Sequence, residues 1–455
     1  MSFKNRSFSQ RLHDVIPGGA HTYSRGDDQF PANAPEILEK ASGAYVFDVN
    51  KRKYLDYGMA LRAVSIGYSE PSINAAAFRG IELGNGFTRP STIELEAAEL
   101  LCDRVKSVEM AKFTKNGSNA TSAAVKLARA YTGKTIVLRC AEHPFFSFDD
   151  WFIGSTQITR GIPIETINQT KLFKYNDMES LRQVASEHSG NIACVIMEPV
   201  ASNCPKSISG SAGCCGKSNC ARRFPEINFL KQVQDFCNSK GIVYILDETI
   251  TGFRWSVGGA QEVFDIEPDI TTFGKAMSNG FSVAAVGGRR DIMQLGSINR
   301  EGAERLFFLS TTHGAEMSGL AAFIETVHFI ENNDVISHLW RYGEELIEKF
   351  NLASAEIGIS KNLFLTGPAP NPILNVLDDA GLPWFELRTL FQNEMIKRDI
   401  LMPWISISYR HTQKEMDATL IAAKDTMRTC VKAIHEGIEK YYAGRIIKPV
   451  FRKFN

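Results

Sequence analysis

The sequence predicts an α/β protein in which helices cover both faces of a mainly parallel, doubly wound sheet. Short apolar runs without alternating polar residues occupy 111–114, 135–139, 193–197, 242–246, 270–273 and 283–287. Such runs are typical of strands buried on both faces. Helical patterns over 118–131 and 226–239 separate several of them, and this alternation indicates the fold class. Ligands of such sheets bind beyond the carboxyl ends of the strands, so we expect the chemistry there.

The two ends of the chain differ from its middle. Residues 37–57 read as a small meander with a turn at Asn50-Lys51, 314–357 as long helices, and 362–455 as short strands with a helix near 414–436. With 455 residues, two or three domains are expected. We predict a large domain over 61–310 and a smaller α+β domain built from 1–60 and 311–455.

Composition narrows the classes of function. Lys and Arg number 51 and Asp and Glu 51, so the net charge is zero. That balance argues against a broad nucleic-acid footprint or a membrane-surface protein. No apolar run approaches the ~18 residues needed to cross a bilayer, and the first residues, MSFKNRSFSQRLHD, are polar. We therefore expect a cytoplasmic enzyme.

The first candidate motif is Asn116-Gly117-Ser118, which follows the run at 111–114 and opens a helical pattern. Free N–H groups at a helix N-terminus bind phosphate, and glycine allows close approach. The alternative is a plain strand-to-helix turn with a polar cap.

Two further residues follow apolar runs. Asp247 ends the run at 242–246, where a carboxylate needs a cationic or hydrogen-bonding partner. Lys275 follows 270–273 among small residues, where an amine can form a Schiff base. Taken singly, a capping Asp and a surface Lys are the alternatives. Together, a phosphate cradle, an anionic partner for a ring nitrogen and an amine match the three polar handles of pyridoxal phosphate.

These motifs resemble class III (fold type I) aminotransferases, and among them the glutamate-1-semialdehyde 2,1-aminomutases. The resemblance runs from about residue 11 to about residue 425 and includes IPGGAHTYSR, GAYVFDVNKRKYLDY, VIMEPV, ILDETITGFR and TTFGKAMSNGF. It implies an aspartate-aminotransferase-like fold, pyridoxal or pyridoxamine 5′-phosphate as cofactor, and a homodimer with shared active sites.

The resemblance also implies roles for single residues. Lys275 forms the Schiff base and shuttles the proton, and Asp247 keeps the ring nitrogen charged so that the ring acts as an electron sink. Asn116, Gly117 and Ser118 bind the phosphate, to which Thr311 or Thr312 adds a contact from the second subunit. Arg25 binds the substrate carboxylate. His21 lies in the same segment and is expected either near the substrate or as an ordinary hydrogen-bonding side chain.

The chain departs from the family pattern around the ring and the entrance. Where the family has Tyr-His-Gly, this chain has Glu142-His143-Pro144-Phe145. Aligning His143 puts Glu142 over the ring, whereas aligning the downstream Asp150-Trp151 puts Phe145 there. We prefer Phe145, because the site needs an apolar plate, with Thr249 on the other side. At the entrance Leu61 replaces an aromatic, and Arg62 either binds a second anionic group or forms a structural salt bridge.

Four of the nine cysteines lie in an insertion over 201–224: Cys204, Cys214, Cys215 and Cys220. Its Gly, Ser and Asn content predicts a loop. Four thiolates can bind zinc, but this spacing matches no standard motif. Reduced thiols, a metal site and a disulfide remain open, and we expect none of them to anchor the cofactor.

The sequence thus predicts a pyridoxal-phosphate-dependent aminotransferase that acts on a small, anionic substrate through Lys275. An aminomutase that moves nitrogen within one substrate is the alternative. A non-catalytic homologue that serves as a binding module is a third reading, which the presence of both Lys275 and Asp247 disfavours.

Overall fold

The computed structural model describes residues 6–201, 204–206 and 228–455, and the chain divides into two compact units. The first unit comprises Met1–Leu61, Ser65–Glu70 and Leu339–Asn455, so it combines both ends of the chain. The second comprises Arg62–Val64 and Pro71–His338. None of the helices in the described part of the chain is long and apolar enough to cross a membrane.

The second unit is built on a seven-stranded sheet of order β4-β10-β9-β8-β7-β5-β6. Its strands are β4 (Met110–Thr114), β5 (Ile136–Cys140), β6 (Thr170–Phe173), β7 (Ile192–Met197), β8 (Val243–Asp247), β9 (Ile270–Phe273) and β10 (Ala284–Gly288). Only β10 runs antiparallel to its neighbours, β9 and β4. Every residue of β5, β7, β8, β9 and β10 is buried, so the mainly parallel, doubly wound sheet expected from the apolar runs is confirmed. The weaker pattern at β6 did not predict a strand.

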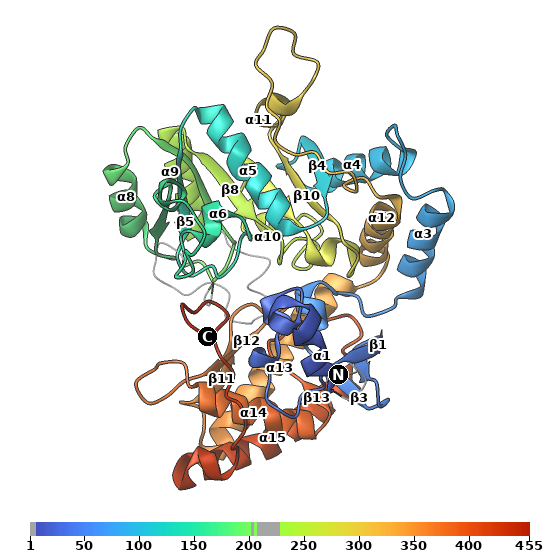
Figure 1. Ribbon diagram of the computed structural model, residues 1–455, viewed down its shortest axis with the longest axis vertical. Helices are drawn as coiled ribbons and strands as arrows, with labels where there is room; N and C mark the ends of the chain where they lie inside the picture. Colours follow the sequence, from blue (N-terminus) through green and yellow to red (C-terminus); the bar gives the residue numbers. More distant parts are fainter. Residues whose placement is uncertain (1–5, 202–203, 207–227) are drawn as a thin grey trace. The chain divides into compact units, whose positions relative to one another are not determined.

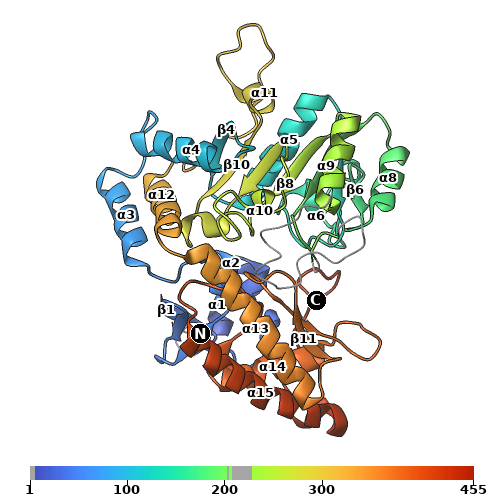
Figure 2. The same cartoon turned by 180° about the vertical axis from the view of Figure 1, so that it is seen from behind.

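Helices cover this sheet on both faces (Figures 1 and 2). α5 (Gly117–Thr132) lies across one face and contacts β7 to β10, while α9 (Phe229–Lys240) and α8 (Met178–Glu187) lie on the other. Small side chains such as Ala120 and Ala124 let α5 approach the strands closely. The remaining helices of this unit are α3 (Pro71–Glu82), α4 (Thr92–Arg104), α6 (Asp150–Ile153), α7 (Ile164–Ile167), α10 (Ala260–Val263), α11 (Arg290–Met293) and α12 (Met317–Asn332).

The first unit contains a four-stranded sheet of order β1-β2-β3-β13 and a two-stranded hairpin. The sheet comprises β1 (Leu38–Ser42), β2 (Tyr45–Asp48), β3 (Lys53–Asp56) and β13 (Ile400–Leu401), and the hairpin β11 (Leu363–Thr366) and β12 (Ile373–Val376). Its helices are α1 (Phe8–Val15), α14 (Phe385–Lys397), α15 (Gln413–Glu436), most of α13 (Val335–Ile357) and most of the short α2 (Met59–Arg62). The meander expected at 37–57 is β1 to β3, with Lys51 of its turn at φ +66°.

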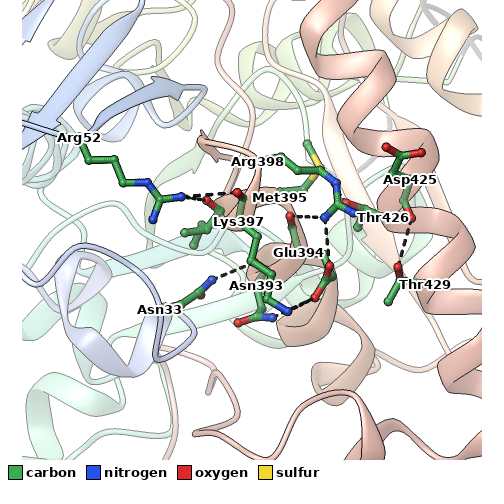
Figure 3. Close-up of polar contacts among 11 residues, drawn as sticks. Asn33, Arg52, Asn393, Glu394, Met395, Lys397, Arg398, Asp425, Thr426 and Thr429 are labelled. Carbon is green, nitrogen blue, oxygen red and sulfur yellow. Dashed lines mark hydrogen bonds and ion pairs between the residues drawn. The ribbon is translucent and has the colours of Figure 1, made fainter.

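Polar contacts at the end of α14 tie the segments of this unit together (Figure 3). Nη2 of Arg52 donates to the carbonyl of Ile396 at 2.9 Å, and Nδ2 of Asn33 donates to that of Asn393 at 2.9 Å. Glu394 forms ion pairs with Lys397 and Arg398 at 2.5 and 3.0 Å. Carbonyls in the last turn of a helix lack intrahelical partners, and the Arg52 bond adds a side-chain donor to the carbonyl of Ile396, which also accepts from the N–H of Asp399 at 3.0 Å.

Candidate active site

The carboxyl ends of several strands meet at one edge of the large sheet, because β4, β5, β7, β8 and β9 all run in the same direction. Met197 pairs with Leu246, and Asp247 pairs with Thr272. Glu198, which follows Met197 directly, therefore continues the row that contains Asp247 and Thr272. Neighbouring strands lie about 4.8 Å apart, so the register brings two carboxylates together at the end of the sheet.

Asp247 is 4% exposed and is held by two hydrogen bonds to one of its oxygens. Its Oδ1 accepts from the backbone N–H of Thr249 at 3.0 Å and from the hydroxyl of Thr272 at 2.8 Å. Both bonds leave Oδ2 for a further partner. Burial raises the pKa of this carboxyl, so a cationic partner would stabilise its ionised form.

Lys275 begins a short 3₁₀ helix, Lys275–Ser278, which is separated from β9 by Gly274 alone. Its φ is +45°, a left-handed conformation that is uncommon for a residue with a side chain. Part of the residue is accessible, but removal of its amine from water lowers the pKa, while the charge of Glu198 acts in the opposite direction. A lowered pKa increases the fraction of neutral amine, the form that attacks a carbonyl.

The N-terminus of α5 lies at the same edge, after β4. The side chain of Asn116 caps the helix and accepts from the N–H of Asn119 at 2.9 Å. Ser118 is buried, and its Oγ accepts from the N–H of Phe148 at 3.3 Å. The N–H groups of the first turn carry the positive end of the helix dipole, which suits an anionic group.

Thr249 lies close to two glycines of the site. A Cβ at Gly117 would lie 3.0 Å from its Cγ2 and 3.1 Å from its Oγ1, and a Cβ at Gly274 would lie 3.3 Å from Cγ2. The hydroxyl of Thr249 is buried, and nothing in the described part of the chain hydrogen-bonds to it. The absence of a Cβ at Gly117 therefore keeps the space between Thr249 and the N-terminus of α5 open.

Glu142 and Phe145, the two residues considered for stacking on the ring, lie in the segment after β5. Glu142 accepts from the thiol of Cys140 at 3.2 Å and from the N–H of Tyr175 at 2.9 Å. These bonds hold its carboxylate against the backbone after β6. Phe145 is 46% exposed and contacts Phe152 edge-on, with ring centroids 5.7 Å apart. The stacking of Phe145 on the ring stays a prediction.

His143 is a buried member of this edge whose role was not predicted. Its ring is 1% exposed, and Nδ1 accepts from the N–H of Glu198 at 3.1 Å. Burial lowers the pKa of this imidazole to about 3, so it is neutral at physiological pH. His143 therefore links the segment after β5 to the end of β7.

Glu198 was also missed, although it belongs to the VIMEPV motif. It is 8% exposed, and burial, followed by the charge of Asp247, raises the pKa of its carboxyl to about 8. The signal that identified Asp247, a carboxylate directly after an apolar strand, applies equally to Glu198. The charges of Lys275 and Arg62 act on it in the opposite direction.

The other predicted residues are distributed over both units. Arg62, in the second unit, has a buried Nε–H that donates to no described residue. Thr311 and Thr312 are exposed on the same unit. Arg25 and His21 belong to the first unit and are exposed there.

The insertion is described only at its ends. Cys204 is buried, and its carbonyl accepts from Nδ2 of Asn176 at 3.0 Å. The N–H of Phe229 donates to the carbonyl of Lys206 at 2.9 Å, so residues on either side of 207–227 are adjacent. Cys214, Cys215 and Cys220 lie outside the described residues, and the loop, metal and thiol predictions stay open.

The residues of the second unit fit pyridoxal phosphate. Oδ2 of Asp247 is available to a protonated ring nitrogen, the amine of Lys275 has a lowered pKa, and Gly117 leaves room that a Cβ would fill. When bound, this cofactor supplies an electron sink for the carbon that carries the amino group.

Comparisons with known proteins agree with this geometry. The aminotransferase class-III family model matches residues 23–361. A 3-aminobutyryl-CoA aminotransferase of Cloacimonas acidaminovorans is 29% identical, covering 95% of this chain and 98% of the relative. A glutamate-1-semialdehyde 2,1-aminomutase of Prosthecochloris aestuarii is 34% identical, covering 77% of this chain and 78% of the relative.

Among solved structures, the FumI protein of Sphingopyxis sp. MTA144, determined with pyridoxal phosphate, is 26% identical with a TM-score of 0.80. The match covers 94% of this chain and 97% of FumI. The family model spans well over half of the chain, and the fold and cofactor of the structural neighbours are those that the sequence motifs predicted. The chain therefore belongs to the class-III aminotransferases, enzymes that transfer amino groups with pyridoxal 5′-phosphate.

Proposed function

We propose that this enzyme transfers an amino group to or from the carbonyl carbon of a small, anionic substrate, with Lys275 as the residue that links to the cofactor. The observation that carries the proposal is the meeting of an amine, a buried carboxylate and a helix N-terminus at one sheet edge. Each matches one polar handle of the cofactor in charge or hydrogen-bonding character.

In this proposal each residue has one task. Asp247, fixed by Thr249 and Thr272, keeps a proton on the ring nitrogen through Oδ2. The first turn of α5, with Asn116, Gly117 and Ser118, holds the phosphate. The amine of Lys275 links to the cofactor and, once displaced by substrate, carries the proton to and from the substrate carbon.

An anionic substrate is supported by the arginines. The Nε–H of Arg62 is buried and donates to none of the described residues, and a carboxylate or phosphate would accept its hydrogen bond. Arg25 is exposed. Because the family resemblance implies carboxylate binding by Arg25, we propose it for the substrate carboxylate, with His21 nearby in the sequence.

Intramolecular transfer is the second candidate, favoured by the 34% identity to a glutamate-1-semialdehyde 2,1-aminomutase. The two candidates differ in the source of nitrogen. With a ¹⁵N-labelled amino donor, a transferase moves the label to a separate acceptor. An aminomutase instead retains unlabelled nitrogen within its own substrate.

We further propose a homodimer with shared active sites. Large apolar side chains are exposed along α3, α4 and the segment between them: Phe78, Ile81, Leu83, Phe87 and Leu95. An exposed apolar patch of this kind is typical of an interaction surface. Thr311 and Thr312 are exposed on the same unit, as a phosphate contact to a second subunit requires. The zero net charge supports an enzyme without nucleic-acid partners, and a cytoplasmic location stays the expectation from the sequence.

Borohydride reduction followed by peptide mapping tests the assignment of Lys275. Reduction of the protein loaded with pyridoxal phosphate should fix the pyridoxyl group on Lys275. Lys275→Ala should lose the covalent label and turnover while keeping its fold.

Lys115→Ala is the matched control, since Lys115 also follows a strand at this edge but is paired with Glu316. It should be labelled like the wild type. A label on any other lysine of the wild-type protein would overturn the proposal.

A further inference from the structure

We propose that Glu198 is a positioning residue that sets the pH range over which the nitrogen of Lys275 carries a proton. The inference rests on the proposed role of Lys275. It concerns a carboxyl group that, in our proposal, binds none of the three polar groups of the cofactor.

The position of Glu198 follows from the sheet register. Met197 and Leu246 are paired, and so are Asp247 and Thr272, so Glu198 stands beside Asp247 at the end of adjacent strands. In a parallel sheet, residues in one row face the same side. Asp247 faces the cofactor in our proposal, and Glu198 shares its side of the sheet.

The backbone of Glu198 is held by a residue of the segment after β5. Its N–H donates to Nδ1 of His143 at 3.1 Å, and that ring is wedged edge-on between Phe146 and Tyr175, with centroids 5.8 and 5.5 Å away. The hydroxyl of Tyr175 donates to the carbonyl of Pro199 at 2.7 Å. The two residues at this strand end are therefore anchored by their backbones, and the Glu198 side chain has no such anchor.

The carboxyl group of Glu198 has no fixed partner. The residue is only 8% exposed, yet within the described part of the chain no side chain or N–H forms a hydrogen bond or an ion pair with its carboxyl oxygens. A buried carboxyl without partners is costly when ionised. Its burial costs little free energy only if the carboxyl is protonated or if a cation lies nearby in the working enzyme.

The charged groups that act on Glu198 come from each neighbouring element. Asp247, after β8, is negative; Lys275, after β9, and Arg62 are positive. His143, after β5, is neutral because burial lowers its pKa. The negative charge opposes ionisation of Glu198 and the positive charges favour it.

The same coupling acts in reverse on Lys275. Burial lowers the pKa of the amine, and so do the charges of Arg62 and Arg254. Glu198 is the largest influence that raises it, ahead of Asp247. Glu198 is thus the carboxyl whose ionisation most favours a proton on this nitrogen. Two groups coupled in this way titrate as a pair.

The charge of Glu198 acts on the nitrogen of Lys275 when it is linked to the cofactor as well. With Asp247 engaged by the ring nitrogen, Glu198 is the remaining carboxylate whose charge acts on Lys275. In its ionised form Glu198 raises the pKa of that nitrogen, and a protonated nitrogen makes the attached carbon a better target for an incoming amine. The step moves one proton between solvent and the nitrogen and changes no other bond.

The experiment is a spectroscopic pH titration of the loaded enzyme in the absence of substrate. The protonated linkage absorbs near ~410–420 nm, and its loss with rising pH gives a midpoint that does not depend on turnover. We expect Glu198→Gln to lower this midpoint by about one pH unit or more, since an opposite charge within several ångströms shifts a pKa by ~1–3 units.

Glu198→Asp should have a midpoint close to that of the wild type, because it keeps the negative charge and retracts it by only one methylene. Glu142→Gln is the matched control. It removes a carboxylate just beyond the neighbouring strand β5 that is already engaged by Cys140 and Tyr175, and its midpoint should equal that of the wild type.

Three outcomes decide the matter. A midpoint in Glu198→Gln that equals the wild type shows that Glu198 is only structural and overturns the inference. If the Gln variant does not fold, Glu198→Ala serves instead, because it also removes the charge: a midpoint below the wild type supports the inference, and an unchanged one overturns it. If the pyridoxyl group maps to a lysine other than Lys275, the proposed function fails first, and this readout separates the two failures.

Discussion

Replacement of Asp247 by asparagine separates the cost of burying this carboxylate from the benefit it gives to the cofactor. The amide oxygen of the new side chain can occupy the position of Oδ1 and accept from Thr249 and Thr272, whose donors lie 3.0 and 2.8 Å away. The amide nitrogen then takes the position of Oδ2. The protonated ring nitrogen, a donor, would face another donor instead of a carboxylate.

The expected loss is that of one charge-assisted hydrogen bond, about 1.5–3 kcal/mol. This corresponds to a dissociation constant for pyridoxal phosphate that is ~10–150-fold higher. The free protein should behave differently. Burial raises the pKa of Asp247, so its ionised form is disfavoured by folding. The stability that this group contributes is lost as pH rises through its folded pKa, and Asp247→Asn should abolish that loss.

Two measurements check the prediction. Titration of the cofactor-free protein with pyridoxal phosphate, followed by absorbance, gives the dissociation constant. Thermal unfolding of the same protein at a series of pH values gives the stability. Thr272→Val is the control, since it removes one neutral donor to Oδ1 and should change cofactor affinity by only a few-fold. Affinity in Asp247→Asn within twofold of the wild type would refute the reasoning.

Three further predictions follow from other contacts. His143 has a folded pKa of about 3 against an ordinary value of 6.5, so the unfolded chain binds more protons and stability should fall as pH drops from 6.5 toward 3. His143→Phe should reduce the slope by up to ~1.4 kcal/mol per pH unit in denaturant unfolding at several pH values, and parallel slopes would contradict this. Gly117→Ala places a Cβ 3.0 Å from Thr249 and should destabilise by ~1–3 kcal/mol, a loss that Thr249→Ala relieves in a double-mutant cycle. An additive cycle would show that the close approach does not matter. Arg25→Ala should raise KM for an acidic substrate ~10–150-fold, from the ~1.5–3 kcal/mol of a charge-assisted pair; steady-state kinetics with a neutral analogue provide the control, and an unchanged KM for every acid tested would remove Arg25 from substrate binding.

The strands that are buried on both faces were predictable, because each appears in the sequence as an unbroken apolar run. The runs at 193–197, 242–246 and 270–273 became β7, β8 and β9 with bounds within one residue of those expected, because a strand covered by helices on both sides needs an unbroken apolar run. β6 lies at the edge of the sheet, with Lys171 and Leu172 not buried. An edge strand needs less apolar surface, so its pattern is weak. The antiparallel direction of β10 was not predictable either, because an apolar run does not indicate in which direction its strand runs in the sheet.

Some residues of the site could be found from the sequence, whereas the contacts between them could not. Asp247, Lys275 and Gly117 were found because each lies at the end of a strand or within three residues beyond it, and strands of one direction bring their carboxyl ends to one edge. The neighbours of these residues were decided by register and loop geometry, which no local pattern encodes. The sequence does not say that Glu198 lies beside Asp247, that Nδ1 of His143 holds the backbone of Glu198, or that Thr249 faces Gly117. Covalent order determined which groups the chain brings to the sheet edge. Only the pairing of strands, a contact between residues about 50 apart in the chain, determined which carboxyl group stands beside which.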